Sequence, residues 1–329
     1  MSTSNDTPVP LILFSLPRSG STLAQRILGA HAEIATVAEP WILLPLLYSL
    51  KERGSYTEYN HQYTNIAIND FCRELPNGQD DYLTAISNFA RELYTKARKG
   101  KEHYFLDKTP RYHLVSDDVM RLFPDGKFIF LWRNPLAIAA SIIETWGGGR
   151  WSIYRFKIDL YEGLAKLIDT YSQHSDTAHA VRYEDLTSNS ETEWKSIFNY
   201  LELDYDPGIL AQFSKVKFEG QLGDPTGVKQ YDAISSEPLQ KWKTTLANPL
   251  RKAWCRRYLN WIGQERLSIM GYDLAELLDE LAAIPSSPRR VIGDIALMSF
   301  GIPYCFFETY TMKHKLKTLP AWRHIHIHR

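Results

Sequence analysis

The pattern of apolar positions near the start of the chain predicts a buried strand followed directly by a helix. An unbroken, mostly apolar run covers residues 9–16 and stops at Pro17, which is typical of a strand buried on both faces of a parallel sheet. Positions 24, 27, 28 and 31 then follow the spacing of one helix face. The chain is therefore expected to pass from strand to helix through a tight turn at residues 18–22.

Further short apolar runs predict more strands of the same sheet, at residues 104–107, 127–132 and 179–183. Sequence of helical period separates them, and this alternation implies crossover helices and a mostly parallel sheet. Asn134 followed by Pro135 predicts a helix start with an Asn cap, and other helices are expected around residues 194–201 and 250–270. We predict an α/β fold with a central, mostly parallel sheet flanked by helices.

Two segments look like additions to this core, which we place in one domain over residues 1–285. Residues 43–101 are rich in Tyr, Asn and charged side chains and fall between candidate site segments, so they are expected to form a lid over an acceptor site. Residues 286–329 form a C-terminal extension, first aromatic and then basic. The apolar run 291–307 is shorter than the roughly 20 residues of a spanning helix and contains Asp294 and Pro303, so we predict no transmembrane span.

Composition narrows the class of protein. The 329 residues carry 38 Lys and Arg against 38 Asp and Glu, with 44% hydrophobic residues, which excludes a disordered chain and argues against a dedicated nucleic-acid binder. Three cysteines without a CxxC pair indicate neither a zinc ribbon nor a disulfide framework. The first residues lack the pattern of a signal peptide. These features favour a cytoplasmic protein.

The turn after the first strand reads Leu-Pro-Arg-Ser-Gly-Ser-Thr-Leu, residues 16–23. Backbone amides and the positive end of a helix dipole at such a turn make an anion site. Arg18 adds charge, Gly20 permits close backbone approach, and three hydroxyls add donors: Ser19, Ser21 and Thr22. The turn lacks the glycines and lysine of a Walker A loop. A serine-rich turn with an exposed arginine is an equally good interpretation of this segment alone.

A second candidate segment follows the strand at residues 127–132. Arg133 lies at the strand end, where α/β proteins place ligand contacts, and Ser141 follows about two helical turns later. Both side chains could reach one phosphate. Taken alone, a surface arginine beside a helix cap is the better interpretation.

Together these two segments, in this order, resemble the sulfotransferases that use 3′-phosphoadenosine 5′-phosphosulfate (PAPS). The segment Val-Arg-Tyr-Glu-Asp-Leu at 181–186 is similar to one common in carbohydrate sulfotransferases, and the resemblance extends over about residues 10–273. It implies a P-loop-like fold in which residues 18–22 hold the 5′-phosphosulfate and Arg133 with Ser141 hold the 3′-phosphate. It also implies that adenosine 3′,5′-bisphosphate (PAP) is the product.

Within this family the chain is most similar to the branch of tyrosylprotein sulfotransferases and their bacterial relatives. After Ala30 and His31, Glu39 falls at the spacing of that branch's general base, and Lys108 falls at the place of its catalytic lysine. The resemblance implies that Glu39 accepts the acceptor's proton and that Lys108 and Arg18 stabilise the leaving phosphate. This chemistry requires no metal. His31 and His113 compete with Glu39 as base, although the spacing of His31 favours a core position.

Two further nucleotide contacts follow from the resemblance with less sequence support. Tyr183 is the candidate for an adenine contact. Lys229, in the segment 223–229, is the candidate for a phosphate contact, and a plain polar turn explains that segment equally well.

The C-terminal extension carries no acidic residue after Glu308 but five basic residues and four histidines. A peripheral contact with an anionic membrane or an acidic polysaccharide is one interpretation, and an aromatic segment packed on the domain with a solvated basic end is another. The alternating histidines 324, 326 and 328 have the spacing of metal ligands on one strand side, but at a chain terminus we treat the pattern as incidental.

The function that follows is transfer of a sulfuryl group from PAPS to a hydroxyl of an acceptor, expected to be a carbohydrate or another metabolite. A kinase-like phosphotransferase is the first alternative, but it needs a loop lysine and an acidic Mg²⁺ ligand at a strand end, where this chain has Lys108 and Arg133. A non-catalytic nucleotide-binding protein is the second alternative, and the presence of both Glu39 and Lys108 argues against it. The sequence indicates neither the acceptor nor the oligomeric state.

Overall fold

The computed structural model describes residues 7–55, 57, 59–213, 216 and 238–307. Within them, a parallel sheet has the strand order β2-β3-β1-β4-β5. The strands are β1 (Val9–Ser15), β2 (Ile34–Thr36), β3 (Tyr104–Asp107), β4 (Lys127–Trp132) and β5 (Ala178–Arg182). The α/β fold with a parallel sheet is thus confirmed, and so are the strands predicted from continuous apolar runs. The three-residue β2 was not predicted.

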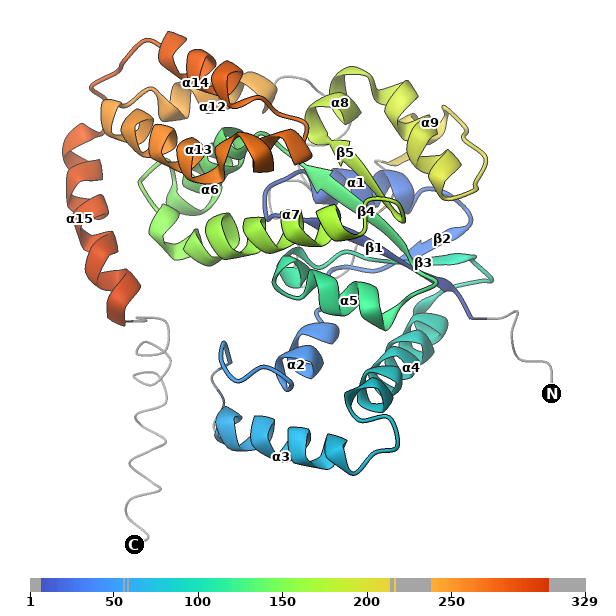
Figure 1. Ribbon diagram of the computed structural model, residues 1–329. Helices are drawn as coiled ribbons and strands as arrows, with labels where there is room; N and C mark the ends of the chain where they lie inside the picture. The colour runs from blue at the N-terminus through green and yellow to red at the C-terminus, as the bar shows by residue number, and fades with distance from the viewer. Residues whose placement is uncertain (1–6, 56, 58, 214–215, 217–237, 308–329) are drawn as a thin grey trace, which may run out of the picture.

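The sheet is the middle of three layers because its side chains alternate between two apolar faces. On β1, Ile12 and Phe14 face one core, and Leu11 and Leu13 face the other. The first core is covered by α5 (Ser116–Leu122), α6 (Pro135–Gly147), α7 (Leu164–Gln173) and α13 (Pro249–Ile269); the second by α1 (Ser21–Leu28), α8 (Tyr183–Ser188), α9 (Ser190–Tyr200) and α10 (Ile209–Gln212). Figure 1 shows α5 and α7 in front of the sheet and α1 behind it.

Several boundaries agree with the sequence analysis and others differ. Asn134 caps α6 by accepting hydrogen bonds from the backbone amides of Leu136 and Ala137, as predicted. Helix α1 ends at Leu28, before His31, so it is shorter than the apolar spacing predicted. Strand β5 spans one residue earlier than predicted, so Tyr183 begins a helix rather than ending a strand.

The 43–101 segment forms three helices: α2 (Leu43–Tyr48), α3 (His61–Arg73) and α4 (Gln79–Ala97). Helix α4 joins the first core through Ile86, Ala90 and Tyr94. Helix α3 lies at the periphery of the molecule (Figure 1) and exposes Tyr63 and Phe71. Helix α2 joins the same core through Leu43, Leu44 and Leu47, so the segment is attached to the core through two helices and open to solvent along the third.

The described part of the C-terminal extension is helix α15 (Val291–Phe307), which lies against α13 and the 3₁₀ helix η2 (Ile153–Phe156). A buried ion pair anchors it: Arg251 Nε lies 2.6 Å from Asp294 Oδ2, and both side chains are at most 3% exposed. No helix of the described residues is long and apolar enough to span a bilayer. The other elements are α12 (Pro238–Leu246), α14 (Leu274–Ala283), the 3₁₀ helix η1 (Pro110–Leu114) and the π-helix η3 (Ile158–Gly163).

Candidate functional site

The carboxyl ends of all five strands bring the predicted site residues to one edge of the sheet. Glu39 follows β2, Lys108 follows β3, residues 18–22 follow β1, Arg133 follows β4 and Tyr183 follows β5. Neighbouring strands lie about 4.8 Å apart, so the order of the strands is also the order of these groups along the edge. Ligands bind at this edge in open α/β sheets.

The turn between β1 and α1 is shaped by two left-handed residues, Arg18 with φ of 70° and Gly20 with φ of 90°. A Cβ atom on Gly20 would lie 2.2 Å from Cδ2 of Tyr183, so only glycine allows the turn to contact that ring. No side chain caps the first turn of α1. Its first backbone amides therefore have no side-chain acceptor, as an anion-binding helix N-terminus requires.

Arg18, Arg133 and Ser141 meet at this turn, although more than a hundred residues separate Arg18 from the others. Arg18 Nε donates to Ser141 Oγ at 3.1 Å, and Arg133 Nη1 donates to the backbone carbonyl of Arg18 at 2.8 Å. The Arg133 guanidinium lies 4.4 Å from the centre of the Tyr183 ring. The two predicted phosphate segments thus form one cluster.

This cluster contains buried donors that no described residue satisfies. They are Ser19 Oγ, Arg133 Nε and, on the preceding strand, Ser15 Oγ. An unpaired buried polar atom costs about 1–3 kcal/mol, and hydroxyl and guanidinium donors beside a helix N-terminus match phosphate oxygens. The residues present therefore fit an anionic nucleotide.

Glu39 and Lys108 form a nearly buried ion pair. Lys108 Nζ lies 2.7 Å from Glu39 Oε1, and the two side chains are 2% and 11% exposed. The second carboxylate oxygen, Oε2, accepts a hydrogen bond of 3.1 Å from Trp41 Nε1. Both groups that the resemblance assigned to catalysis are thus side by side and held in one orientation.

A buried carboxylate, Asp107, stabilises the turn that carries Lys108. It accepts hydrogen bonds from the hydroxyls of Tyr94, Tyr112 and Thr109 at 2.7, 2.9 and 3.1 Å. Burial raises the pKa of Asp107 to about 6, and the three hydroxyl donors oppose that rise. Thr109 Oγ1 also accepts from the backbone amide of Trp41 at 3.2 Å, so one network connects the turn of Lys108 with the segment of Glu39.

The two competing histidines lie outside this arrangement. His31 Nε2 is 3.2 Å from the carbonyl of Asp204, and its ring is tilted by 32° against that of Phe198, with centroids 5.2 Å apart. It is half-buried against the second core rather than on the face of α1, where the spacing placed it. His113 is fully buried, 2.8 Å from Asp159 Oδ1, and burial lowers its pKa. Glu39 is the carboxylate beside Lys108.

The remaining predicted site residues are Ser21, Thr22, Tyr183 and Lys229. Ser21 and Thr22 begin α1 as expected. Tyr183 is 1% exposed, in contact with Gly20 and Arg133, so its contact with adenine stays a prediction. Lys229 lies outside the described residues. The sequence analysis missed Trp41, Asp107 and Thr109, although an aspartate at the end of an apolar strand, directly before the candidate lysine, was a usable signal.

Comparisons with known proteins agree with the resemblance to sulfotransferases. A model described as "Sulfotransferase family" matches residues 10–207. Nodulation protein NoeE of Sinorhizobium fredii is 37% identical over 327 residues, covering 87% of this chain and 73% of that protein. A protein-tyrosine sulfotransferase of Drosophila melanogaster is 23% identical, covering 93% of this chain and 56% of that protein.

Among solved structures, the sulfotransferase domain from the curacin biosynthetic pathway aligns with a TM-score of 0.53 at 22% identity. The alignment covers 79% of this chain and 98% of that domain. At this identity the likeness concerns the fold, which is the P-loop-like α/β fold predicted from the two phosphate segments.

Proposed function

Because the chain belongs to the sulfotransferase family, we propose that it transfers the sulfuryl group of PAPS to a hydroxyl of a carbohydrate or a similar metabolite. Membership of this family argues against the kinase-like and the non-catalytic alternatives. The donor, the acceptor class and the roles of individual residues are parts of this proposal.

One observation carries the proposal: the buried pair of Glu39 and Lys108 lies at the same sheet edge as the arginine cluster. A carboxylate near the acceptor and cations near the leaving group are what sulfuryl transfer needs, because the acceptor loses a proton while charge grows on the phosphate. The strand order places the lysine between the carboxylate and the anion-binding turn. In an in-line displacement the acceptor and the leaving oxygen lie on opposite sides of the sulfur, and this order is consistent with a base on the acceptor side and cations on the side of the leaving oxygen.

The residues after β1 and β4 are proposed to hold the donor. When bound, PAPS supplies the sulfuryl group and a phosphate leaving group. The α1 amides with Ser19, Ser21 and Thr22 would bind the 5′ end, while Arg133 and Ser141 would bind the 3′-phosphate. Support comes from the unpaired Ser19 Oγ and Arg133 Nε, which an anionic oxygen could satisfy.

The residues after β2 and β3 are proposed to carry out the transfer. One Glu39 oxygen takes the proton of the acceptor hydroxyl, while the Trp41 hydrogen bond holds the carboxylate in place. Lys108 Nζ, freed from the neutralised Glu39, turns its charge to the leaving oxygen together with Arg18. The 2.7 Å distance of the pair supports this exchange, because one proton transfer changes the charge on the partner of Lys108.

The acceptor is proposed to reach this edge beside the 43–101 segment, which serves as a lid. Residues 181–186 support a carbohydrate acceptor through their similarity to carbohydrate sulfotransferases. Leu43 donates its backbone amide to the Tyr112 hydroxyl at 3.4 Å, and that hydroxyl also bonds Asp107. The lid therefore shares its first residue with the network behind Lys108.

The test is transfer of label from ³⁵S-PAPS to a panel of glycans, phenols and alcohols. Glu39→Gln should reduce turnover at least a hundredfold, whereas the exposed Glu33→Gln, near the start of β2, should leave it unchanged. Full activity of Glu39→Gln would show that the base is another group, and no transfer to any hydroxyl would overturn the proposal.

A further inference from the structure

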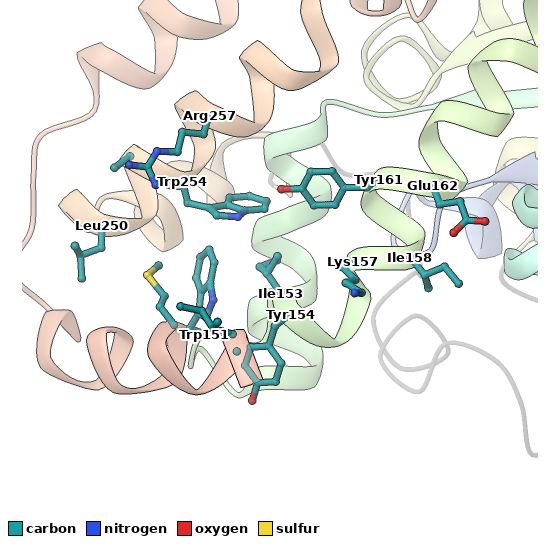
Figure 2. Close-up of a pocket in the computed structure, with 14 residues that line it drawn as sticks. Trp151, Ile153, Tyr154, Lys157, Ile158, Tyr161, Glu162, Leu250, Trp254 and Arg257 are labelled. Atoms are coloured by element: carbon teal, nitrogen blue, oxygen red, sulfur yellow. The ribbon is translucent and has the colours of Figure 1, made fainter. Parts of the chain in front are cut away.

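A cavity of about 850 Å³ lies away from the sheet edge, between α13, α15 and the segment 151–162 (Figure 2). Its wall is mostly apolar and contains two tryptophans and two tyrosines: Trp151, Trp254, Tyr154 and Tyr161. Its volume is in the upper part of the range of small-molecule sites, which is about 300–1,000 Å³. None of the residues given a role above lines it.

The aromatic wall is preformed. Trp151 is 4% exposed, and its ring meets Trp254 edge-on, with centroids 5.3 Å apart. Trp254 in turn stacks on Tyr258 at 4.9 Å, and Tyr161 packs against the same Tyr258 at 5.3 Å. A preformed apolar wall lowers the entropic cost of binding an apolar group.

Besides the hydroxyls of Tyr154 and Tyr161, the lining has three charged side chains among its fourteen residues. Lys157 and Arg257 are cationic, and Glu162 lies 3.2 Å from Lys166, a residue outside the lining. Figure 2 shows Glu162 at one end of the wall, with Trp151 and Trp254 facing one another at the other. An oligosaccharide would bring many hydroxyls to a wall with few partners for them. An aliphatic chain needs none, so the lining favours a chain.

Aromatic contacts extend from the anion-binding turn to the chain segment that contributes to this cavity. The Arg18 guanidinium lies 5.6 Å from the centre of the Trp146 ring, which is 40% exposed. Trp146 stacks on Phe156 at 4.6 Å, and Phe156 directly precedes the cavity residue Lys157 in the chain. These two rings therefore link the anion-binding turn to the chain segment whose neighbouring residues, Tyr154 and Lys157, line the cavity.

We propose, on the basis of the proposed function, that the acceptor is an amphipathic molecule whose aliphatic chain occupies this cavity while its hydroxyl-bearing head group lies at the sheet edge. The aliphatic chain of the acceptor enters between the two tryptophans and Met298 of α15. The head group passes Trp146 on its way to Arg18 and Lys108. The enzyme then selects acceptors partly by their tail.

The probe is dodecyl maltoside below its micelle-forming concentration, titrated calorimetrically, with maltose as the head-group control. We expect one saturable site for dodecyl maltoside and at least tenfold weaker binding of maltose, because each buried methylene strengthens binding about fourfold. Equal affinities for the two compounds would overturn the inference.

Two variants change the cavity without touching the core, one by bulk and one by charge. Ala253→Trp adds bulk at an exposed lining position of α13, and Ile302→Asp places a charge at a position of α15 that is 64% exposed. Each should weaken dodecyl maltoside at least tenfold. The matched controls, Ala275→Trp on α14 and Ile292→Asp at the other end of α15, are exposed positions outside the lining and should bind as the wild type does.

The transfer assay decides whether the bound chain belongs to the acceptor. With ³⁵S-PAPS, the dodecyl glycoside should have a KM at least tenfold below that of the methyl glycoside at similar kcat, and Ala253→Trp should abolish that difference. Equal KM values would overturn the inference. So would an Ala253→Trp protein that changes only its sedimentation, because the cavity would then hold a second copy of the chain.

Different results would contradict the cavity assignment and the proposed function. A protein that binds PAP and transfers sulfuryl groups, but gains nothing from the dodecyl chain, contradicts the cavity assignment alone. A protein that binds the dodecyl chain as predicted but neither binds PAP nor uses PAPS contradicts the proposed function.

Discussion

The two halves of the sheet edge differ in how far their charged and polar groups are already paired within the protein. In the β2–β3 half, Lys108 is neutralised by Glu39 at 2.7 Å, and Asp107 is bonded to three hydroxyls. In the β1–β4–β5 half, Arg133 donates to a backbone carbonyl and keeps a buried Nε without a partner among the described residues. The first half is complete without a ligand, whereas the second has donors left for one.

This difference separates the work of the two halves. A buried pair that is already satisfied attracts no further ion, but it can exchange a proton and then release one partner. A cluster with unpaired donors gains free energy only when an anion arrives. The β2–β3 half should therefore determine the transfer rate, and the β1–β4–β5 half should determine nucleotide affinity.

The largest effect is expected for Lys108→Met, which removes the charge but keeps the side chain's length. Turnover should fall by about 10²–10³, equivalent to about 3–4 kcal/mol in the barrier, while PAP affinity changes less than threefold. The exposed Lys101→Met is the control for loss of a lysine in the same region. A matching loss of PAP affinity in Lys108→Met would erase the distinction between the halves.

A second prediction concerns the network behind Lys108. Since burial raises the pKa of Asp107 to about 6, the folded protein holds this proton more tightly than the unfolded chain. The group's contribution to stability is present below pH 4 and is lost as pH rises to about 6, a change of about 3 kcal/mol. Asp107→Asn cannot titrate. In urea unfolding, the free energy of unfolding of the variant relative to that of the wild type should therefore increase from pH 4 to pH 7. A difference independent of pH would contradict the raised pKa.

Removal of the cation after β4 should change affinity instead of rate. Arg133→Gln is expected to weaken PAP about 10–100-fold, as for a lost charged hydrogen bond of about 1.5–3 kcal/mol, and to leave AMP unchanged, because AMP has no 3′-phosphate. The exposed Arg155→Gln serves as the control. Calorimetry gives both constants, and equal weakening of PAP and AMP would refute the 3′-phosphate assignment.

The smallest effect is expected for Ser141→Ala, which deletes the hydroxyl that accepts from Arg18 at 3.1 Å. The hydroxyl is bonded to a charged guanidinium, so its loss should cost about 1.5 kcal/mol, the lower end for such a bond, and PAP should weaken by about tenfold. Transfer at saturating PAPS should stay near the wild-type rate. A large loss of turnover would mean that Ser141 helps to fix Arg18 for catalysis.

Local signals account for the parts of this fold that the sequence predicted. Strands β1, β3 and β4 are continuous apolar runs, and Asn134 with Pro135 is a local helix start. Strand β2 is three residues long and follows a helix closely, so it has too few positions to show a pattern. Helix α1 ends before His31 although the apolar spacing continues to that residue, so the spacing alone did not give the end of the helix.

The site was predictable only in part for a related reason. Glu39 and Lys108 were identified by resemblance, but their contact depends on β2 and β3 being neighbours, which the sequence alone does not state. The hydrogen bonds from Tyr94 and Tyr112 to Asp107 join an inserted helix to a strand end. The cavity between α13 and α15 likewise forms from segments far apart in the chain, so no local pattern announced it.

The most direct test of the account is to measure the PAP dissociation constant and the ³⁵S-PAPS transfer rate on the same preparations of wild type, Lys108→Met and Arg133→Gln. The account predicts a crossed result, in which Lys108→Met loses rate at unchanged PAP affinity and Arg133→Gln loses PAP affinity but transfers at saturating PAPS. If both variants lose rate and affinity in the same proportion, the two halves of the sheet edge do not have separate roles in transfer and nucleotide binding.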